Sequence, residues 1–322
     1  MKISLALGGK SEPVEIDFDK TTVDWKRQNY GQFTPHGVYL KEIDRSLFIK
    51  RLTRQPLALP FLKSHLRAPC SGNLPRLYAV AEDREPVYGF RHYFFYERLE
   101  GITLNVLKGE INIRHCHEIL SGVFTAMLSI IKRGYWHCDL DFRNVFVGKG
   151  SSHETVRLID LDSLMPLSLS FKDYLSDSCR RPNVNERYWS YVVPGFDGER
   201  LGRLSGISLS QAAFIYFAVD LFFFIKYPTN HVSLKPADLN KIMSRDNDRY
   251  FPKDAKRLWR QIHNQIFTNP GQGASWRDVD RFTTMAYGFT ENLSDITSGT
   301  IFGGILRSAG NFLNSALGRS RP

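Results

Sequence analysis

Cysteines are scarce in this sequence, and they do not come in pairs. The 322 residues contain four of them, without the short spacings that zinc sites use, namely Cys70, Cys116, Cys138 and Cys179. The sequence therefore indicates neither a zinc site nor a disulfide framework, and a reducing, cytoplasmic environment is expected. No internal repeat is visible, which argues against a repeat architecture.

Long apolar runs are also missing. The first apolar stretch ends at Gly8 and Gly9 and is soon followed by acidic residues, so no signal peptide is expected. The most apolar run, AAFIYFAVDLFFFIKY over 212–227, has the length of a buried helix and contains Asp220. A membrane-spanning segment is therefore not expected there.

Acidic residues are outnumbered by basic ones, 33 against 43, which gives a formal net charge of +10. Such an excess suits a polyanionic partner such as nucleotide phosphates, nucleic acid, anionic lipid or an acidic glycan, and solubility alone explains it equally well. The apolar fraction of 42% is that of an ordinary folded protein. The length suffices for one large domain or for two lobes that share a cleft.

Hydrophobic patterns divide the chain into a β-rich first part and a largely helical second part. Alternating or aromatic-rich segments predict strands over 37–43, 46–52, 74–80 and 90–99, with a short helix over 56–69. The first two strands are expected to form a hairpin with a two-residue turn at Asp44 and Arg45. Further on, helices are expected over 117–134, 208–226, 236–243 and 252–267, and short strands over 144–147 and 156–160. This order is typical of a two-lobed α+β enzyme.

A set of polar side chains stands between two short apolar strands. His137, Asp139 and Asn144 have the spacing H-x-D-x-x-x-x-N, and Asp160 and Asp162 follow on the next strand. A carboxylate beside a reacting hydroxyl can accept its proton. An asparagine oxygen and further carboxylates are ligands that Mg²⁺ prefers when it bridges phosphates. Any single aspartate is common in turns, but the ordered set indicates phosphoryl transfer.

These motifs resemble those of the protein-kinase-like superfamily. The segment HCDLDFRN resembles the catalytic loop, and IDLD stands where kinases carry D-F-G. The resemblance implies a two-lobed α+β fold, with a β-rich lobe over 1–100 and a helical lobe over 101–298. Residues 299–322 are treated as a separate tail because of the amphipathic pattern described below. The resemblance also implies that the protein is a kinase that uses ATP and Mg²⁺.

The resemblance implies roles for single residues. Asp139 matches the catalytic base, and the Mg²⁺ ligands would be Asn144, Asp160 and Asp162. Lys50, in LFIK, matches the third-strand lysine that binds nucleotide phosphates. The other nucleotide-binding positions would be the hinge at Glu97 and Leu99 and the phosphate loop at Gly31 and Gly37, while Asp220 matches an aspartate that braces the catalytic loop.

The sequence departs from the kinase pattern in three places. It lacks a G-x-G-x-x-G loop near the start, and it has no glutamate between residues 51 and 81. Lys50 therefore needs another acidic partner, for which Asp160 is the candidate. Cys138 replaces the arginine of H-R-D, so activation by phosphorylation of a loop is not expected.

The motif HxDL…N followed by LIDxD is similar to that of bacterial lipopolysaccharide core kinases of the Kdo and heptose type. That similarity implies a sugar hydroxyl of a glycolipid as the phosphoryl acceptor. A Ser/Thr protein kinase, which would act on a protein hydroxyl, and a small-molecule kinase resembling aminoglycoside phosphotransferases remain alternatives. A pseudokinase that serves as a nucleotide-binding scaffold is a further one, and no nucleic-acid partner is expected.

The last segment of the chain has an amphipathic pattern. Apolar residues between Ile301 and Leu317 fall on one face at helical spacing, and the opposite face is formed mainly by Gly, Ser and Asn. This pattern suits either a helix docked on the helical lobe or an interfacial helix at a lipid surface. With a glycolipid acceptor, the second interpretation predicts a cytoplasmic protein in peripheral contact with the inner membrane.

Overall fold

The structure is a computed structural model of mixed α and β composition, as the sequence predicted. The predicted helix over 236–243, except Met243, and the tail over 299–322 lie outside the described residues. The structure describes residues 2–5, 14–17, 22–24, 36–40, 45–82, 91–107, 113–148, 156–169, 203–226, 243 and 253–296.

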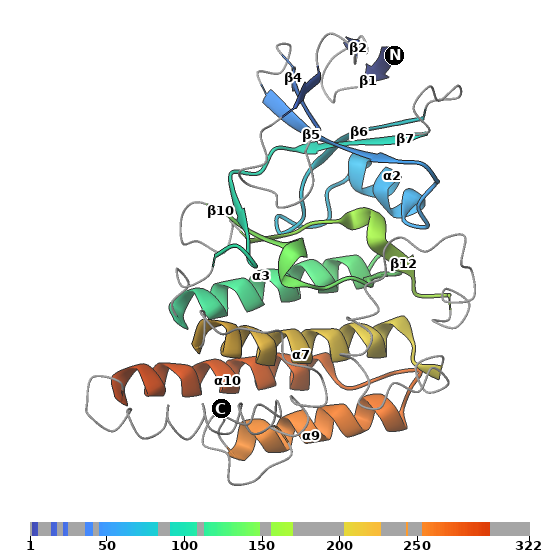
Figure 1. The fold of residues 1–322 in the computed structure, drawn as a ribbon. Helices are drawn as coiled ribbons and strands as arrows, with labels where there is room; N and C mark the ends of the chain where they lie inside the picture. Colours follow the sequence, from blue (N-terminus) through green and yellow to red (C-terminus); the bar gives the residue numbers. More distant parts are fainter. Residues whose placement is uncertain are drawn as a thin grey trace, which may run out of the picture.

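A five-stranded antiparallel sheet carries Lys50 and lies near the top of Figure 1. Its strands follow the order β3-β4-β5-β7-β6 and comprise β3 (Thr22–Asp24), β4 (His36–Leu40), β5 (Arg45–Leu52), β6 (Leu77–Glu82) and β7 (His92–Glu97). Strands β4 and β5 form the predicted hairpin, with Leu40 opposite Arg45. The connection is therefore residues 41–44, longer than the predicted two-residue turn. A separate antiparallel pair joins β1 (Lys2–Leu5) and β2 (Val14–Asp17).

The register of β5 and β7 determines which side chains share a face of the sheet with Lys50. Lys50 lies opposite Phe94, and Phe48 lies opposite Tyr96. Because side chains alternate along a strand and paired residues face the same way, these four side chains project from one face. Strand β7 is buried from His92 to Tyr96. Lys50 therefore has an aromatic, water-poor surface beside it.

Helix α2 (Leu59–Arg67) confirms the short helix predicted between the strands. It buries Leu59, Phe61 and Leu62 and packs against β6 and against the short 3-10 helix η5 (Leu161–Ser163). Figure 1 shows it directly below the sheet. Since α2 contains no acidic residue, its contribution to the region around Lys50 is apolar packing and not a counter-charge.

Two small antiparallel sheets lie between the large sheet and the lower helices and position the polar motifs. One has the order β8-β10-β11, formed by β8 (Gly101–Thr103), β10 (Val145–Gly148) and β11 (Val156–Leu158). The other pairs β9 (Tyr135–His137) with β12 (Leu164–Pro166). Gly101 has a φ of 145°, and a Cβ there would clash with the carbonyl oxygen of Val147. Only glycine allows β8 to lie this close to β10.

Four long helices form the lower half of the molecule in Figure 1, namely α3 (Ile113–Ile131), α7 (Gly206–Lys226), α9 (Lys253–Thr268) and α10 (Trp276–Ile296). Helix α3 contacts α7 and α10, and α10 also contacts α9. The sequence predicted α3, α7 and α9. It also predicted the end of α3, where Gly134 has a φ of 80°. Helix α10 was missed, although Val279, Phe282 and Ala286 recur at helical spacing and are buried.

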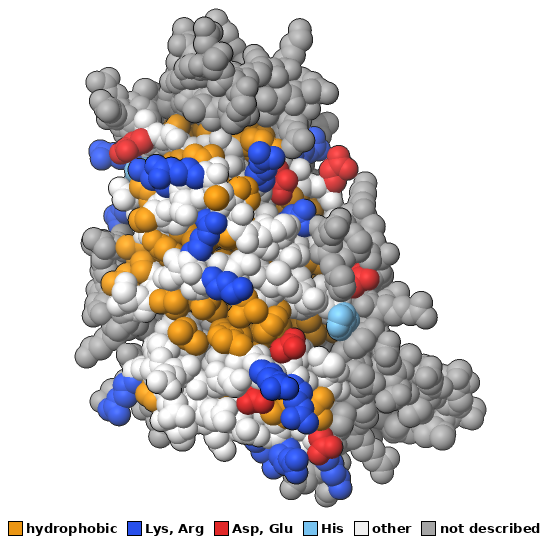
Figure 2. Space-filling view, turned by 180° about the vertical axis from the view of Figure 1, so that it is seen from behind, with side chains coloured by type: hydrophobic (Ala, Val, Ile, Leu, Met, Phe, Trp, Pro, Cys, Tyr) orange, Lys and Arg blue, Asp and Glu red, His pale blue; other side chains and the backbone are white. Residues whose placement is uncertain are grey.

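The surface of the described residues mixes charge signs. Figure 2 shows Lys and Arg side chains spread over the rear face among acidic and apolar ones, from the sheet down to the last helices. Within the described part of that face the basic residues form no single large patch. Among the helices that the structure describes, none is long and apolar enough to cross a membrane.

Candidate functional site

The segment after β9 holds Asp139 in a fixed orientation. A 3-10 helix, η3 (Phe142–Asn144), begins there, and the Asp141 side chain accepts a hydrogen bond from the Arg143 amide. The Asn144 side-chain amide donates to the Asp139 carbonyl at 2.7 Å and to Asp139 Oδ2 at 2.9 Å. The other carboxylate oxygen, Asp139 Oδ1, is buried and has no hydrogen-bond partner among the described residues. One oxygen of Asp139 is therefore anchored, and the other is left for a ligand.

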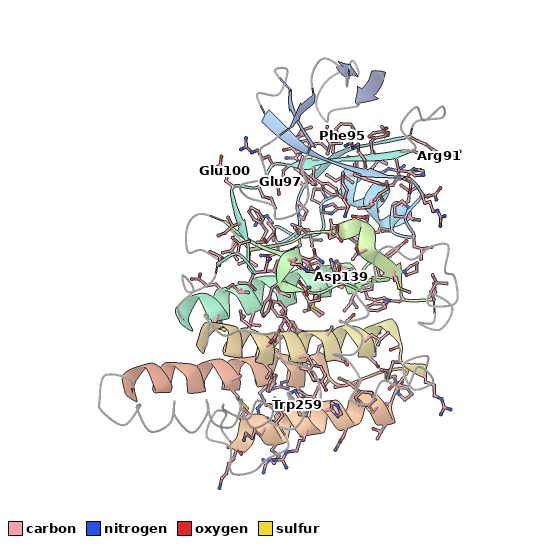
Figure 3. The ribbon with its side chains drawn as sticks, in the orientation of Figure 1. Arg91, Phe95, Glu97, Glu100, Asp139 and Trp259 are labelled. Atoms are coloured by element: carbon pink, nitrogen blue, oxygen red, sulfur yellow. The ribbon has the colours of Figure 1, made fainter. Side chains whose placement is uncertain are left out.

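The electrostatic surroundings of Asp139 favour its protonated form. Burial raises the pKa of the Asp139 carboxyl, and the nearby charge of Asp141 raises it further. The hydrogen bond from Asn144 and the positive charges of Arg143 and Lys50 lower that pKa without cancelling the effect of burial. Figure 3 shows Asp139 in the layer between the large sheet and α3. A carboxylate with a raised pKa is a better proton acceptor near neutral pH than an exposed aspartate.

The segment after β11 lies against this loop. The Ile159 amide donates to the Asn144 carbonyl at 2.8 Å, which brings the next residue, Asp160, beside Asn144. Asp160 has a φ of 67° and a ψ of 44°, and it is the one non-glycine residue with positive φ in the described part of the chain. The Ser163 hydroxyl donates to Asp160 Oδ2 at 2.7 Å. This left-handed turn leads into η5, where the Asp162 side chain is only 5% exposed.

Lys50 joins the sheet to the two aspartates. Its ammonium forms an ion pair with Asp160 Oδ1, 110 residues later in the chain, and lies 2.6 Å from Asp162 Oδ1. The expected pairing of Lys50 with Asp160 is therefore present. The structure adds Asp162 as a second partner. Both carboxylates share one ammonium.

His137 and Cys138 support the loop without facing it. His137 Nε2 is 2.9 Å from the Ile159 carbonyl, and Nδ1 accepts a hydrogen bond from the Asp139 amide at 3.3 Å. The carbonyl can only accept, so Nε2 carries the proton and the ring is neutral. Burial lowers the pKa of His137 to about 4. The Cys138 thiol donates to the Ser163 carbonyl at 2.6 Å. His137 and Cys138 thus tie β9 to the Asp160–Ser163 turn.

Some of these supporting roles were not predicted from the sequence. Ser163 was not singled out, and Cys138 was noted only as the replacement of an arginine. The position of Ser163, one residue after Asp162, gave a weak signal, because hydroxyl side chains often bond to neighbouring turns.

The residues predicted as Mg²⁺ ligands come together and suit the ion in part. Asn144 uses its amide nitrogen on Asp139, so its carbonyl oxygen is the atom that can bind a cation, beside Asp160 and Asp162. No group of three or more His, Cys, Asp or Glu side chains able to hold a metal occurs among the described residues. Two carboxylates and an amide are typical of Mg²⁺ sites that are completed by substrate phosphates.

Lys50, Asp139, Asn144, Asp160 and Asp162 form one cluster of polar side chains. The other predicted nucleotide-binding residues that the structure describes belong to β4, to β7 and to the segment after β7. Glu97 is the last residue of β7, and Glu100 lies beyond it, just before β8, as the labels in Figure 3 show. The Glu97 amide donates to the Arg76 carbonyl at 2.8 Å, and Glu97 Oε1 accepts from the Arg76 amide at 3.0 Å. The Glu97 amide is thus already used, and half-buried Leu99 is the next predicted hinge position. Gly37 belongs to β4, opposite Phe48, and Gly31 lies outside the described residues.

Helix α7 supports the Asp139 loop from below. The Phe217 ring of α7 meets the Phe142 ring of η3 edge to face, with centroids 5.2 Å apart. Asp220, the predicted brace, lies one turn further along the same helix and is half-buried. A small cavity of about 50 Å³ lies elsewhere, between His117 of α3 and Asp280 of α10, and none of its lining residues belongs to the cluster.

Comparison of the sequence with protein-family models and with curated proteins found no match. The site geometry is therefore the basis for any functional conclusion.

Proposed function

We propose that this protein is an ATP-dependent kinase that transfers a phosphoryl group to a hydroxyl. One observation carries the proposal: Lys50 from the sheet meets Asp160 and Asp162 beside Asp139, whose Oδ1 is buried and without a partner among the described residues. A scaffold has no need for an isolated buried carboxylate oxygen, which is costly to desolvate. A phosphoryl-transfer site needs these groups together.

The arrangement also supports a two-lobed, protein-kinase-like fold. The sheet with α2 would form the first lobe, and the four long helices would form the second. Lys50 lies on the sheet, and the other members of the cluster, Asp139, Asn144, Asp160 and Asp162, lie in the segments between α3 and α7. A site formed by two structural units suits a reaction in which a nucleotide and an acceptor meet in a cleft.

Asp139 would act as the base. Its free Oδ1 would accept a hydrogen bond from the acceptor hydroxyl and then its proton, as the hydroxyl oxygen forms a bond to the γ-phosphorus. The bond from that phosphorus to the β–γ bridging oxygen breaks, and ADP leaves. Asn144 would keep the Asp139 carboxylate aimed through its 2.9 Å hydrogen bond. Orientation of this kind lowers the barrier because the reacting atoms are already in place.

The other residues would hold the phosphates. Lys50 would bind phosphate oxygens of the nucleotide, and Asn144, Asp160 and Asp162 would hold Mg²⁺. A bound Mg²⁺ supplies positive charge that offsets the charge developing on the phosphate oxygens. The Ser163 hydroxyl and the left-handed backbone of Asp160 would keep the Asp160 carboxylate pointed at this position.

For the acceptor, we propose a sugar hydroxyl of lipopolysaccharide core. Support comes from the second aspartate of the IDLD segment, the residue on which the resemblance to the Kdo and heptose kinases rests. Asp162 is almost fully buried and lies 2.6 Å from Lys50 Nζ, so it takes part in the cluster. A membrane glycolipid would also suit the net charge of +10.

The test is phosphoryl transfer from γ-labelled ATP with Mg²⁺ by the purified full chain. Three acceptors would be offered separately: delipidated core oligosaccharide, intact lipopolysaccharide and a mixture of unrelated proteins. We expect label on both sugar acceptors, and at least a thousandfold slower transfer by Asp139→Asn. Asp254→Asn is the matched control, because Asp254 is exposed on α9, away from the cluster.

Each of the other results has a definite meaning. Label on proteins alone would replace the sugar acceptor by a protein hydroxyl. If no acceptor is labelled but ATP still raises the melting temperature of the wild type, the sugar and protein acceptors are both excluded, and a nucleotide-binding pseudokinase or a small-molecule kinase takes their place. Full turnover by Asp139→Asn would show that Asp139 is not the base.

A further inference from the structure

The Lys50 ammonium lies between the Asp160 and Asp162 carboxylates, at the position that a metal ion bound to both would occupy. It pairs with Asp160 Oδ1 and lies 2.6 Å from Asp162 Oδ1. The Lys50 and Asp160 side chains keep 26% and 24% of their surface exposed, whereas Asp162 keeps 5%. Lys50 thus reaches the pair from the solvent side, and one positive charge neutralises only one of two negative charges.

A second group on this face of the sheet, the Tyr96 hydroxyl, is buried and has no hydrogen-bond partner among the described residues. Tyr96 projects from the same face of the sheet as Lys50 and is 5% exposed. The nearby charge of Asp162 adds to the effect of burial and raises the pKa of Tyr96 well above its ordinary value. Asp162 Oδ1 likewise has its ion pair with Lys50 but no hydrogen bond.

We propose that Asp160 and Asp162 form a divalent-cation site in which the Lys50 ammonium is a resident counter-ion, exchanged for the metal when nucleotide phosphates draw the lysine away. This inference rests on the proposed function for the source of the phosphates. It adds a regulatory property, because the protein alone excludes the cation and the nucleotide admits it.

Charge and ligand number both support the exchange. A divalent cation and an ammonium at the same two carboxylates would repel each other at short range. Within the described residues no third acidic or histidine ligand completes a metal site. A site with so few protein ligands needs phosphate oxygens to hold the ion. The phosphates would therefore do two things: attract Lys50 and supply the missing ligands. Metal and nucleotide should each raise the affinity for the other.

Tyr96 would be a positioning residue in the state in which the metal has replaced the Lys50 ammonium. Once Lys50 leaves, Asp162 loses its ion-pair partner while it remains almost fully buried. A buried charge without a partner is costly. The Tyr96 hydroxyl is close enough for the Asp162 charge to affect it and is unused. It would then donate a hydrogen bond to Asp162 and keep that carboxylate aimed at the metal.

The test is Mn²⁺ binding, measured by electron paramagnetic resonance of the full chain without nucleotide and with a non-hydrolysable ATP analogue. Wild type should bind Mn²⁺ weakly alone and at least tenfold more tightly with the analogue. Lys50→Met should bind Mn²⁺ alone at least tenfold more tightly than wild type and gain little from the analogue. Lys63→Met, at an exposed position of α2, is the matched control and should behave like wild type.

A second measurement, the melting temperature, keeps the test valid if Lys50→Met is too unstable for the binding experiment. Without the ammonium, Asp160 and Asp162 repel each other, so Mn²⁺ should raise the melting temperature of Lys50→Met more than that of wild type. The double variant Lys50→Met/Asp162→Asn should lose both effects. If folded Lys50→Met binds Mn²⁺ no more tightly than wild type, the proposed exchange is wrong. If Lys50→Met is unstable and Mn²⁺ does not raise its melting temperature, the proposed exchange is wrong as well. Tyr96→Phe should weaken Mn²⁺ binding only in the presence of the analogue.

The outcomes separate this inference from the proposed function. If Lys50→Met gains Mn²⁺ affinity but the wild type phosphorylates no acceptor, the cation site stands and the kinase proposal fails. If the wild type transfers phosphate but Lys50→Met gains nothing, the kinase proposal stands and Lys50 is not an exchangeable counter-ion.

Discussion

The ionisation of Asp139 is controlled by its immediate neighbours. Burial and the Asp141 charge raise its pKa, and Asn144, Arg143 and Lys50 lower it. Arg143 pairs with Asp141 at 2.8 Å, so Asp141 also determines how much of the Arg143 charge acts on Asp139. The working pH of the proposed base therefore depends on a residue that does not touch the acceptor.

Asp141→Asn should move the acid limb of the transfer rate to lower pH. The substitution removes a negative charge that raises the Asp139 pKa and frees the Arg143 charge, so both effects lower that pKa. The asparagine keeps an oxygen for the Arg143 amide, and η3 should remain intact. The measurement is kcat/KM against pH, with Asp254→Asn as control. A limb that stays in place or moves to higher pH would contradict this account of Asp139.

For the individual residues, the sequence predicted the main members of the candidate site but few of the contacts between them. Spacing alone brought Asp139, Asn144 and Asp160 together, because a short loop and two adjacent strands leave few other arrangements. Lys50 was expected to pair with Asp160. The part played by Tyr96 depends on the register of β5 and β7, which no local pattern specifies.

Among the elements, α3 supports the site through a close approach to β11. Gly122 of α3 faces Val156 of β11, and a Cβ at Gly122 would lie 2.7 Å from the Val156 Cβ. Val156 is buried four residues before Asp160. The absence of a side chain at Gly122 thus determines how near the Asp160 strand lies to the helix.

Gly122→Ala should destabilise the protein by about 1–3 kcal/mol, because an extra methyl group in a filled core forces neighbours apart. Within an exposed helix the same change would stabilise by roughly 0.5–1 kcal/mol. Thr125→Ala, exposed one turn further along α3, is the control and should be neutral or slightly stabilising. Urea unfolding measures both. A more stable Gly122→Ala protein would show that the space between α3 and β11 accommodates a methyl group without strain.

Elements with a strong internal pattern were predicted well. Helices α2, α3 and α9 and strands β4 to β7 follow apolar periodicity, α7 coincides with the most apolar run of the chain, and the structure confirms these elements. Helix α10 was missed because arginine and aspartate residues interrupt its apolar positions near Trp276. The short pair of β9 and β12 joins residues 27 to 31 apart, with Tyr135 and Pro166 at the upper limit, and such pairing depends on tertiary packing.

Among the described residues, buried His137 and half-buried His263 oppose folding in acid. Burial lowers the pKa values of His137 and His263 to about 4. Between pH 6.5 and 4 the unfolded chain binds protons at these rings that the folded chain does not, so the free energy of unfolding falls as the pH falls. Each ring contributes up to about 2 kcal/mol of this loss by pH 5.

His263→Phe should make stability less dependent on pH between 7 and 5. The His263 ring stacks on Trp259 of α9, labelled in Figure 3, with centroids 4.9 Å apart, and a phenyl ring can keep that contact. His263 Nε2 has no hydrogen-bond partner among the described residues, so little polar bonding is lost. Thermal unfolding at both pH values is the measurement. Trp259→Phe, which changes packing but no titrating group, should keep the wild-type slope, and an unchanged slope in His263→Phe would contradict the burial effect.

The left-handed backbone of Asp160 restricts which amino acids position 160 can carry. Glycine and asparagine adopt that conformation readily but bring no negative charge. Glutamate brings the charge, but a side chain of its kind pays roughly 1–2 kcal/mol for this backbone and places its carboxylate one bond further out. In a library that samples all twenty residues at this position, selection for stability would enrich glycine, asparagine and aspartate, and selection for the Lys50 ion pair would favour aspartate among these three. Backbone geometry and charge together thus make position 160 the least replaceable in the cluster.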